Sequence, residues 1–382
     1  MTTTTDDART TMDDIVVLIT GAGAPGASGI IKSLRSVDER DVTIVGVDMN
    51  SHAYGFALVD EAYVVPAGGD DDYVPRLLDV ATDENVDIVL PLTTAELEPL
   101  AAAKERFRAE GIEVAVSDPD ALAAANDKGD LYEAVGDFGL SAAPTYRRVA
   151  SEAEFLDAVR ELGYPENPVC FKRPVASGMR GFRVLDPDRD RLDSLLNEKP
   201  TAATTTLDEI VPVLSSGEEF PELVVMEFLP GAEYSVDVLA MGDEVGPVVP
   251  RSRERTRAGI SFEGVVERNE DLIDAATEIC RRLGLEYSVN LQFKYDADGT
   301  PKLLEINPRV SGTIIMCVGA GANFPYFAVK HALGEDIPPV DVDWGTRMIR
   351  YWQEVFHSPD GTLFHVTGEN DRAPVVRGRG QR

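Results

Sequence analysis

Long apolar runs, cysteine and lysine are scarce in this sequence of 382 residues. No apolar run approaches the roughly 20 residues of a membrane span, and the first ten residues, MTTTTDDART, contain no basic, apolar leader. We therefore expect a soluble, cytoplasmic protein with no membrane partner. Cys170, Cys280 and Cys317 are odd in number and widely spaced. This pattern argues against a disulfide framework or a zinc site and favours ordinary buried thiols.

Basic residues are few relative to acidic ones. The chain has 67 acidic and 36 basic residues, a net charge of −31, and only 8 of the basic residues are lysine. Such a surface repels itself in dilute buffer, but at 1 M salt the Debye length falls to about 3 Å and the repulsion is screened. The composition is typical of a halophilic protein, with an ordinary acidic protein as the alternative. It argues against a nucleic-acid partner.

Several familiar catalytic patterns are absent from the sequence. It contains no G-x-S-x-G motif of serine hydrolases and no Walker P-loop. The four histidines are dispersed, without carboxylate or cysteine partners at ligand spacing. No internal repeat or coiled coil is visible. The chemistry must therefore be sought in other motifs.

The first third of the chain alternates apolar strands with helices, the pattern of an open, doubly wound parallel sheet. A glycine pattern, Gly21, Gly23 and Gly26, follows the first strand, and Asp48 ends the second. Taken alone, this is a dinucleotide-binding fingerprint, which would make the protein an NAD-dependent oxidoreductase. Pure turn geometry is the alternative. The expected strands are 14–20, 42–47, 63–66, 87–91 and 113–117, and the expected helices are 29–37, 73–85 and 95–110.

The most informative stretch is KLLEINPRVSG, at 302–312. Residues two apart on an extended strand point to one face, so Glu305, Asn307 and Arg309 are expected side by side. Gln292 lies on the preceding apolar segment, SVNLQF. Carboxylate and carboxamide oxygens suit Mg²⁺ bound to substrate phosphates, and the arginine is suited to the charge of a moving phosphoryl group. An amphipathic hairpin with an Asn-Pro turn is the simpler alternative.

This stretch resembles the end of the nucleotide-binding region of ATP-grasp enzymes, most closely those related to the large subunit of carbamoyl-phosphate synthetase. The resemblance implies ATP and Mg²⁺ (or Mn²⁺) as cofactors. It implies that Gln292, Glu305 and Asn307 hold the metal ions and that catalytic Arg309 contacts the phosphorylated intermediate. It also implies that the glycine turn, with Gly23, helps to shape a substrate pocket.

Two lysines match the basic positions of the family. Lys128 lies just ahead of a helix, and Lys172 ends a strand before the segment ASGMRG. Small residues let backbone N–H groups approach phosphate oxygens, so Ser177 and Gly178 are expected in a flap over ATP. The segment has fewer glycines than many family members. Because the chain reads Lys172-Arg173-Pro174, either cation could face the nucleotide; we favour Lys172, since successive strand residues point to opposite faces.

The segment EFLPGAEYSVD, from residue 227, reads as a strand that breaks and resumes. A break leaves backbone groups that an adenine edge can use. The resemblance implies that Phe228 and Leu229 read adenine through their backbone, that Glu227 contacts its amino side and that Glu233 binds the ribose. A hairpin with exposed glutamates is the alternative.

Arginines occur at every second position from Arg251 to Arg257. If the strand stays extended, they line one face. Arg251, Arg253 and Arg257 would then form a basic wall for a carboxylate or acyl-phosphate substrate. A solvated or salt-bridged face is the alternative.

The resemblance covers about 14–340 and implies an α/β protein with an ATP-grasp fold. The expected parts are a loose N-terminus (1–13), a pre-ATP-grasp domain (14–124), a nucleotide clamp (125–340) and a C-terminal segment with a disordered tail (341–382). The clamp divides into a small lobe (125–222) and a catalytic lobe (223–340). Near its end, 347–352 is expected to be a closing strand.

The activity that this resemblance implies is an ATP-dependent carboxylate-amine, or carboxylate-thiol, ligase. An acyl-phosphate would be the intermediate, and ADP and phosphate the products. The partners would be a small carboxylate and an amine, and a homodimer is compatible with the sequence. The alternatives are the NAD-dependent oxidoreductase and a non-catalytic nucleotide-binding relative of carbamoyl-phosphate synthetase. Because the chain has one E-x-N-P-R motif, from Glu305 to Arg309, and about a third of that subunit's length, complete carbamoyl-phosphate synthesis is not expected.

Overall fold

The computed structural model describes residues 12–176, 180–197, 203–257, 259–360 and 362–364. Almost all of the N-terminal segment expected to be loose, and the whole of the final RGRGQR, lie outside these residues. No helix in the described part is long and apolar enough to cross a membrane. Cys170, Cys280 and Cys317 are buried and free, as expected.

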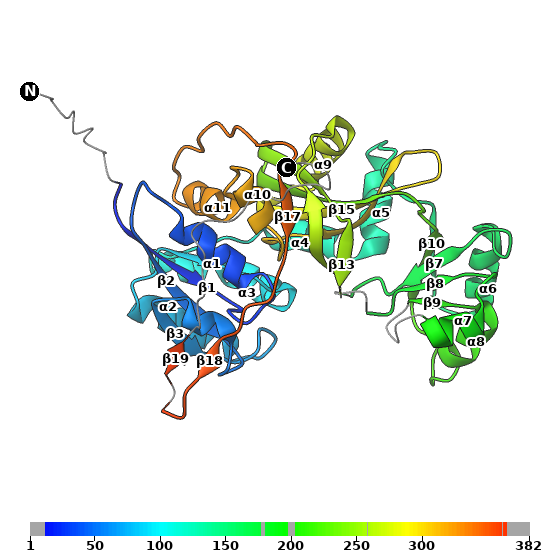
Figure 1. Cartoon of the computed structure of the whole chain (residues 1–382), viewed down its shortest axis with the longest axis horizontal. Coiled ribbons are helices and arrows are strands. Elements are labelled where there is room, and N and C mark those ends of the chain that lie inside the picture. The colour runs from blue at the N-terminus through cyan, green and yellow to red at the C-terminus, as the bar shows by residue number, and fades with distance from the viewer. Residues whose placement is uncertain (1–11, 177–179, 198–202, 258, 361, 365–382) are drawn as a thin grey trace, which may run out of the picture.

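The N-terminal part is a five-stranded parallel sheet with the order β3-β2-β1-β4-β5 (Figure 1). Strand β1 is buried because helices cover both faces: Val17 and Ile19 pack with α1, while Leu18 packs with α2 and α3. The open parallel sheet predicted from the sequence is thus confirmed. Its elements are β1 (Ile15–Ile19), α1 (Ala27–Arg35), β2 (Val42–Asp48), a 3₁₀ turn (Tyr54–Ala57), β3 (Glu61–Val64), α2 (Tyr73–Asp83), β4 (Ile88–Leu90), a second 3₁₀ turn (Thr94–Glu96), α3 (Leu97–Ala109) and β5 (Glu113–Val114).

A second five-stranded sheet, with the order β6-β10-β7-β8-β9, forms the small lobe that lies apart from the N-terminal sheet in Figure 1. One face is covered by helices around a core that includes Phe155 and Phe171, whose rings meet edge to face. The elements are β6 (Tyr146–Val149), α6 (Glu152–Glu161), β7 (Val169–Lys172), β8 (Arg183–Leu185), α7 (Arg191–Asn197), β9 (Thr204–Thr205), α8 (Leu207–Leu214) and β10 (Leu223–Glu227).

The third sheet is antiparallel, with the order β12-β11-β15-β16, and lies between the other two. Helices α4, α5 and α9 pack on one face, and α10 and α11 on the other. Helices α4 and α10 were not predicted from the sequence. The elements are α4 (Pro119–Asn126), α5 (Lys128–Asp137), β11 (Glu233–Met241), β12 (Glu244–Ser252), α9 (Glu270–Arg282), β15 (Glu286–Tyr295), β16 (Pro301–Asn307), α10 (Ile315–Gly319) and α11 (Phe324–Ala332).

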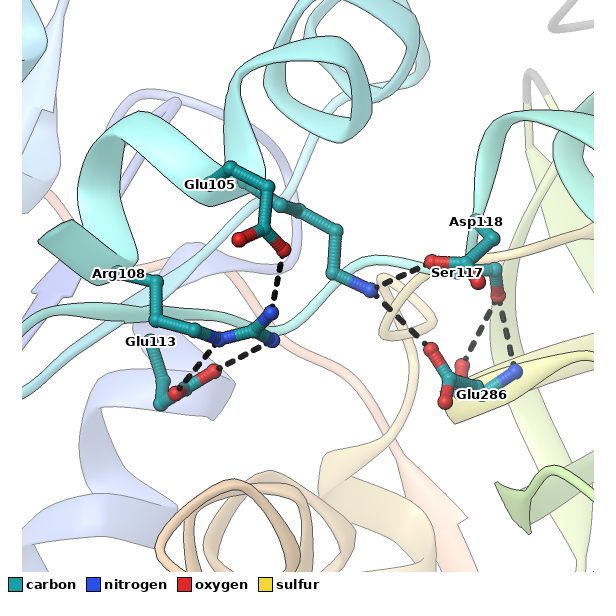
Figure 2. A network of polar contacts seen from close by, with 7 residues as sticks. Glu105, Arg108, Glu113, Ser117, Asp118 and Glu286 are labelled. Atoms are coloured by element: carbon teal, nitrogen blue, oxygen red, sulfur yellow. Dashed lines mark hydrogen bonds and ion pairs between the residues drawn. The ribbon is translucent and has the colours of Figure 1, made fainter.

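A polar network joins the N-terminal helices to the start of β15 (Figure 2). Lys104 Nζ on α3 lies 2.9 Å from Asp118 Oδ1 and 3.2 Å from Glu286 Oε2. The Ser117 hydroxyl donates to Glu286 O at 3.2 Å and accepts from Glu286 N at 2.9 Å. These bonds fix the strand that carries Gln292 relative to the N-terminal sheet.

The chain then returns toward the N-terminal sheet (Figure 1, orange to red). Strand β17 (Arg347–Ile349) pairs with β14 (Ile260–Val265), which also pairs with β13 (Arg255–Arg257). The expected closing strand at 347–352 is therefore present but ends at Ile349. Strands β18 (Phe356–His357) and β19 (Leu363–Phe364) follow, and the His357 ring lies 5.4 Å from that of His52.

The glycine turn after β1 packs directly on the loop that follows β16. A Cβ atom on Gly26 would lie 2.4 Å from Gly312 Cα, closer than real contacts allow. Gly21 has φ +55°, a conformation that glycine adopts without strain. Glycine at these positions lets the backbone of the N-terminal sheet reach the end of the third sheet.

Candidate functional site

A cavity of about 530 Å³ lies where the three sheets meet. Most of the residues predicted for the site line it, although they come from distant parts of the chain. Arg251, Arg257 and Gly23 do not line it, and Ser177 and Gly178 lie outside the described residues. The predicted residues that line it are Lys128, Lys172, Glu227, Phe228, Leu229, Glu233, Arg253, Gln292, Glu305, Asn307 and Arg309.

The proposed metal-binding side chains lie on two paired strands. Strands β15 and β16 are antiparallel, and their register places Gln292 opposite Glu305 and Asn290 opposite Asn307. Glu305 and Asn307 line the cavity, whereas Ile306 between them packs in the core. Asn307 Nδ2 donates to Glu305 Oε1 at 3.2 Å. The period-two pattern of the sequence thus brings these oxygen-bearing side chains to one face.

Arg309 lies just beyond the end of β16. Its Nη2 donates to Asn307 Oδ1 at 3.0 Å, and its Nη1 donates to Val310 O at 2.9 Å. Its Nε is buried without a hydrogen-bond partner, and burial lowers the pKa of its guanidinium. A buried cation that carries an unused donor is suited to bind an anion in the cavity.

Two buried lysines, Lys128 and Lys172, lie close to Glu305. Lys128 Nζ donates to Ala176 O at 2.9 Å and lies 4.0 Å from Glu305 Oε2. Lys172 Nζ donates to the Tyr132 hydroxyl at 2.7 Å and to Leu304 O at 2.8 Å. Burial lowers the pKa of both lysines, and the charge of Lys128 lowers that of Lys172 further. Two desolvated cations beside one carboxylate favour a polyanionic ligand.

The geometry favours Lys172 over Arg173 as the cation that faces a nucleotide. Lys172 is buried at the end of β7, and its ammonium group points toward Leu304, beside Glu305. Arg173 lines the same cavity, but its side chain is exposed.

We expect the binding of Mg-ATP to take up about one proton at pH 8.5, and less near pH 6. Burial lowers the pKa of Lys172 to about 7, so its amine is largely neutral at pH 8.5, and a bound phosphate would restore its charge. Calorimetry in two buffers with different ionisation enthalpies measures this uptake. The uptake should vanish in Lys172→Met and persist in Lys302→Met, which changes an amine that binds Ser141 O outside the cavity. No proton uptake by the wild type at pH 8.5 would refute the assignment.

The lowered pKa of Lys172 also makes the stability of the unliganded protein depend on pH. The unfolded chain keeps Lys172 near its usual pKa of 10.5. Between about pH 7 and 10.5 the unfolded state therefore binds more protons than the folded state, so this lysine makes the free energy of unfolding rise with pH across that window.

The segment between β10 and β11 also lines the cavity. Glu227 ends β10, and its Oε1 accepts a hydrogen bond from Thr145 N at 2.7 Å. Phe228 and Leu229 follow outside either strand, and Lys294 Nζ lies 5.4 Å from the centre of the Phe228 ring. The strand break predicted from Pro-Gly is present, and Phe228 and Leu229, just before Pro230, line the cavity.

Glu233 begins β11 and pairs with Arg253 Nε at 2.6 Å. Arg253 Nη2 also donates to Gly259 O at 2.8 Å. This arginine is therefore held at the cavity wall by a carboxylate and by the hairpin of β13 and β14.

The expectation that the arginines at 251–257 line one face is wrong. Strand β12 ends at Ser252 and β13 begins at Arg255, so the chain does not stay extended. Arg251 is fully buried, with Nε 2.5 Å from Asp237 Oδ2 and Nη2 2.7 Å from Ser311 Oγ. Arg257 lies over the ring of Trp352, with Cζ 5.6 Å from its centre. A buried guanidinium needs a paired acid, and Asp237 supplies it within the protein.

Gly23 does not reach the cavity, although Ala24, Pro25 and Gly26 do. Gly23 N donates to Asp48 Oδ2 at 2.7 Å, and Asn50 N donates to Asp48 Oδ1 at 2.8 Å. Both oxygens of the acidic residue in the dinucleotide fingerprint are thus used within the turn. This arrangement does not favour the ribose contact that an NAD site requires.

Mg²⁺ in proteins is often held by one or two carboxylates together with substrate phosphates. The cavity offers Glu305 and the amide oxygens of Gln292 and Asn307. In the described part of the chain, no group of three or more histidine, cysteine, aspartate or glutamate residues could hold a metal ion. The residues present therefore fit a metal that arrives with a phosphate ligand, and do not fit a closed structural site.

Comparison with known proteins agrees with this geometry. A family profile described as "ATP-grasp in the biosynthetic pathway with Ter operon" matches residues 219–352, and the profile "PylC-like, N-terminal domain" matches 17–115. The chain is an ATP-grasp protein. It is distantly related to carbamoyl-phosphate synthase and to the fold group of N5-carboxyaminoimidazole synthetase and biotin carboxylase.

The curated relatives of this ATP-grasp protein are remote. The carbamoyl-phosphate synthase of Methanobrevibacter smithii is 24% identical over 291 residues, which cover 72% of this chain and 70% of the relative. The large chain from Methanothermobacter thermautotrophicus is 25% identical, with coverage of 82% and 29%. The chain thus spans less than a third of that large chain.

Solved structures establish the ATP-grasp fold, with its N-terminal five-stranded parallel sheet. An N5-carboxyaminoimidazole synthetase from Staphylococcus aureus, complexed with ADP, has a TM-score of 0.61 at 14% identity and covers 86% of this chain and 80% of its own. A biotin carboxylase domain from Hydrogenobacter thermophilus, in complex with MgADP and bicarbonate, has a TM-score of 0.61 at 17% identity, with coverage of 87% and 72%.

The residues that sequence reasoning missed include Tyr132, Asn290 and Asp237, which lie in the cavity or contact residues that line it. Tyr132 donates from its hydroxyl to Leu304 O at 2.7 Å and accepts from Lys172. Asn290 lines the cavity and donates to Asp237 Oδ1 at 2.9 Å. The period-two spacing between Asn290 and Gln292 was a signal for Asn290. No local pattern indicated Tyr132 or Asp237, because their partners are far away in the sequence.

Proposed function

We propose that this ATP-grasp protein is an ATP-dependent ligase that joins a carboxylate to an amine, or to a thiol, through an acyl-phosphate. The observation that carries the proposal is the pairing of β15 with β16, which places Gln292 opposite Glu305, next to Asn307 and facing Lys128 and Lys172 across one cavity. The cavity thus has a cationic part suited to a triphosphate and an oxygen-rich part suited to its metal.

The proposed binding mode divides the cavity between nucleotide and acid. Lys128 and Lys172 hold the phosphates, the segment at Phe228 and Leu229 binds adenine, and Glu233 binds the ribose. Ser177 and Gly178 would belong to the flap. A bound Mg²⁺ or Mn²⁺ would neutralise phosphate charge, held by Gln292, Glu305 and Asn307. Arg309, beyond the metal ligands, would receive the acid.

The reaction then follows from positioning and charge stabilisation. One oxygen of the acid attacks the γ-phosphorus, the bond to ADP breaks, and an acyl-phosphate forms beside Arg309. The amine then attacks the acyl carbon and loses a proton, and phosphate leaves with that oxygen. Arg309 stabilises the charge on the phosphoryl group throughout. The protein need supply no covalent nucleophile.

The proposal also includes the domain limits, the location in the cell, the halophilic surface and the oligomeric state. We keep the domain limits 14–124, 125–222, 223–340 and 341–382 as predictions, together with a cytoplasmic, halophilic protein that forms a homodimer. The biotin carboxylase domain of H. thermophilus is described as a dimer. The net charge of −31 supports assays in molar KCl, where it is screened.

In molar KCl we expect Mg-ATP to raise the unfolding temperature and NADH to leave it unchanged. A ligand at 100 times its dissociation constant adds about 2.7 kcal/mol, which a melting curve resolves. A shift with NADH and none with ATP would revive the oxidoreductase alternative. A screen for ADP release over acids and amines then tests the ligase itself. Nucleotide binding with no ADP release from any pair would instead favour the non-catalytic relative.

A further inference from the structure

The C-terminal segment 347–352, called the strap here, touches three segments that line the cavity. Strand β17 pairs with β14, and Arg350 N donates to Phe262 O at 2.8 Å. The Trp352 ring packs against Phe262 at 5.5 Å and against Arg257 at 5.6 Å. The strap thereby holds the hairpin of β13 and β14, whose residues Thr256 and Ile260 line the cavity.

The side chain of Arg350 connects the other two segments. Its Nη2 donates to Gly312 O at 3.0 Å, in the loop that follows Arg309. Its Nη1 approaches Pro25 O at 3.5 Å, in the glycine turn of the N-terminal sheet. Both Pro25 and Gly312 line the cavity. One guanidinium therefore bridges the loop that carries Arg309 and the glycine turn of the N-terminal sheet.

Arg350 makes this bridge without an acidic partner. Arg350 is half-buried, and burial lowers the pKa of its guanidinium. Among the described residues, no carboxylate lies within ion-pair distance of it, although the chain has 67 acidic residues. Partial burial of a cation carries a desolvation cost, which an ion pair on the surface would have avoided. The two carbonyl contacts of Arg350 therefore serve to hold the two loops in position.

The two bridged segments are also in direct backbone contact. A Cβ atom on Gly26 would lie 2.4 Å from Gly312 Cα, so glycine there permits the approach that Arg350 fixes from outside. A Cβ atom on Gly29 would similarly lie 2.9 Å from Ile315 Cβ. Both observations place the N-terminal sheet against the loop that extends from Arg309.

We propose that Arg350 is a positioning residue for acyl transfer. By binding Gly312 O and Pro25 O, it fixes the distance between the glycine turn and the loop of Arg309, and so sets where the acid lies relative to Arg309. Its kinetic effect rests on the proposed ligase function, whereas its effect on the two loops does not. A misplacement of about 1 Å can cost about a hundredfold in rate.

The test compares Arg350→Met with Arg347→Met in the full chain. Both change one arginine of the strap to an uncharged side chain of similar length. Arg347 pairs with Glu254 and Glu263 on the protein surface and contacts neither cavity loop. Hydrogen exchange of peptides covering 20–30 and 308–316 should become at least about fivefold faster in Arg350→Met and stay unchanged in Arg347→Met. This measurement requires no substrate.

The kinetic arm uses the acid that gives most ADP in the wild-type screen. We expect Arg350→Met to raise KM for the acid, or to lower kcat, by a combined 10- to 100-fold. The dissociation constant of Mg-ATP should change by less than about twofold, because the side chain of Arg350 contacts Pro25 O and Gly312 O and neither lysine. Arg350→Lys can reach one carbonyl and should recover part of the loss.

The exchange and kinetic results together decide whether Arg350 positions the two loops. Faster exchange in both loops, together with the acid-specific loss, supports the proposal. Unchanged exchange in Arg350→Met overturns it, and so does an equal loss of acid and ATP binding. If no acid gives ADP in the wild type, the proposed function fails separately, and the exchange measurement still decides whether Arg350 holds the two loops.

Discussion

Glu305→Gln and Asn307→Ala are expected to abolish ADP formation while leaving the fold intact. Both residues lie on the cavity face of β16, and their oxygens are proposed to hold the metal ion on the phosphates. Without that ion the largest positive charge near the transferring group is lost. Loss of a single preorganised charge-stabilising group typically costs about a hundred- to a thousandfold in rate, so ADP release should fall by at least that factor.

The control for this pair is Glu278→Gln on α9, which does not line the cavity. Glu278 pairs with Arg281 and Arg282 on the same helix, and surface pairs contribute little to stability. The control should keep the wild-type rate, and all three variants should keep the wild-type melting temperature within a few degrees. Full activity in Glu305→Gln or in Asn307→Ala would rule out the metal role of that residue.

The second large effect is a difference between two cations of the cavity. Arg309→Ala should retain ATP affinity and lose turnover by about a hundred- to a thousandfold, because Arg309 is proposed to contact the acyl-phosphate. Lys172→Ala should weaken ATP binding as well, because its contact with phosphate would already exist in the ground state. Nucleotide titration and an ADP-release assay on the two variants measure the difference.

Arg309→Lys serves as the matched control, since it keeps the charge and loses the guanidinium geometry. Partial recovery by this variant would separate charge from shape. If Arg309→Ala loses ATP affinity as severely as Lys172→Ala, or turns over at the wild-type rate, the acyl-phosphate does not lie at Arg309.

The sequence predicted the parts of this fold that depend on local patterns. Apolar strands followed by helices indicated the parallel sheet, and the period-two spacing of Glu305 and Asn307 placed both residues on one face. The strand break at Pro230 and Gly231 was also visible as local backbone chemistry. In each of these cases a short stretch of chain determines the geometry.

Contacts between distant parts of the chain could not be predicted in this way. The arginine series at 251–257 has a regular spacing, but Asp237 on the neighbouring strand draws Arg251 into the core. Tyr132 lies 40 residues from Lys172, and no spacing rule connects them. The role of Arg350 depends on carbonyls at Pro25 and Gly312, which any residue type supplies.

The central claim, an acyl-phosphate formed between the acid and ATP, is tested most directly by isotope transfer. The acid identified in the screen is labelled with ¹⁸O in its carboxyl group and converted with Mg-ATP and the amine. In the proposed reaction the oxygen that attacks the γ-phosphorus leaves with the phosphate, so each phosphate formed should carry one ¹⁸O from the acid. Phosphate without the label, released in step with product, would contradict the account.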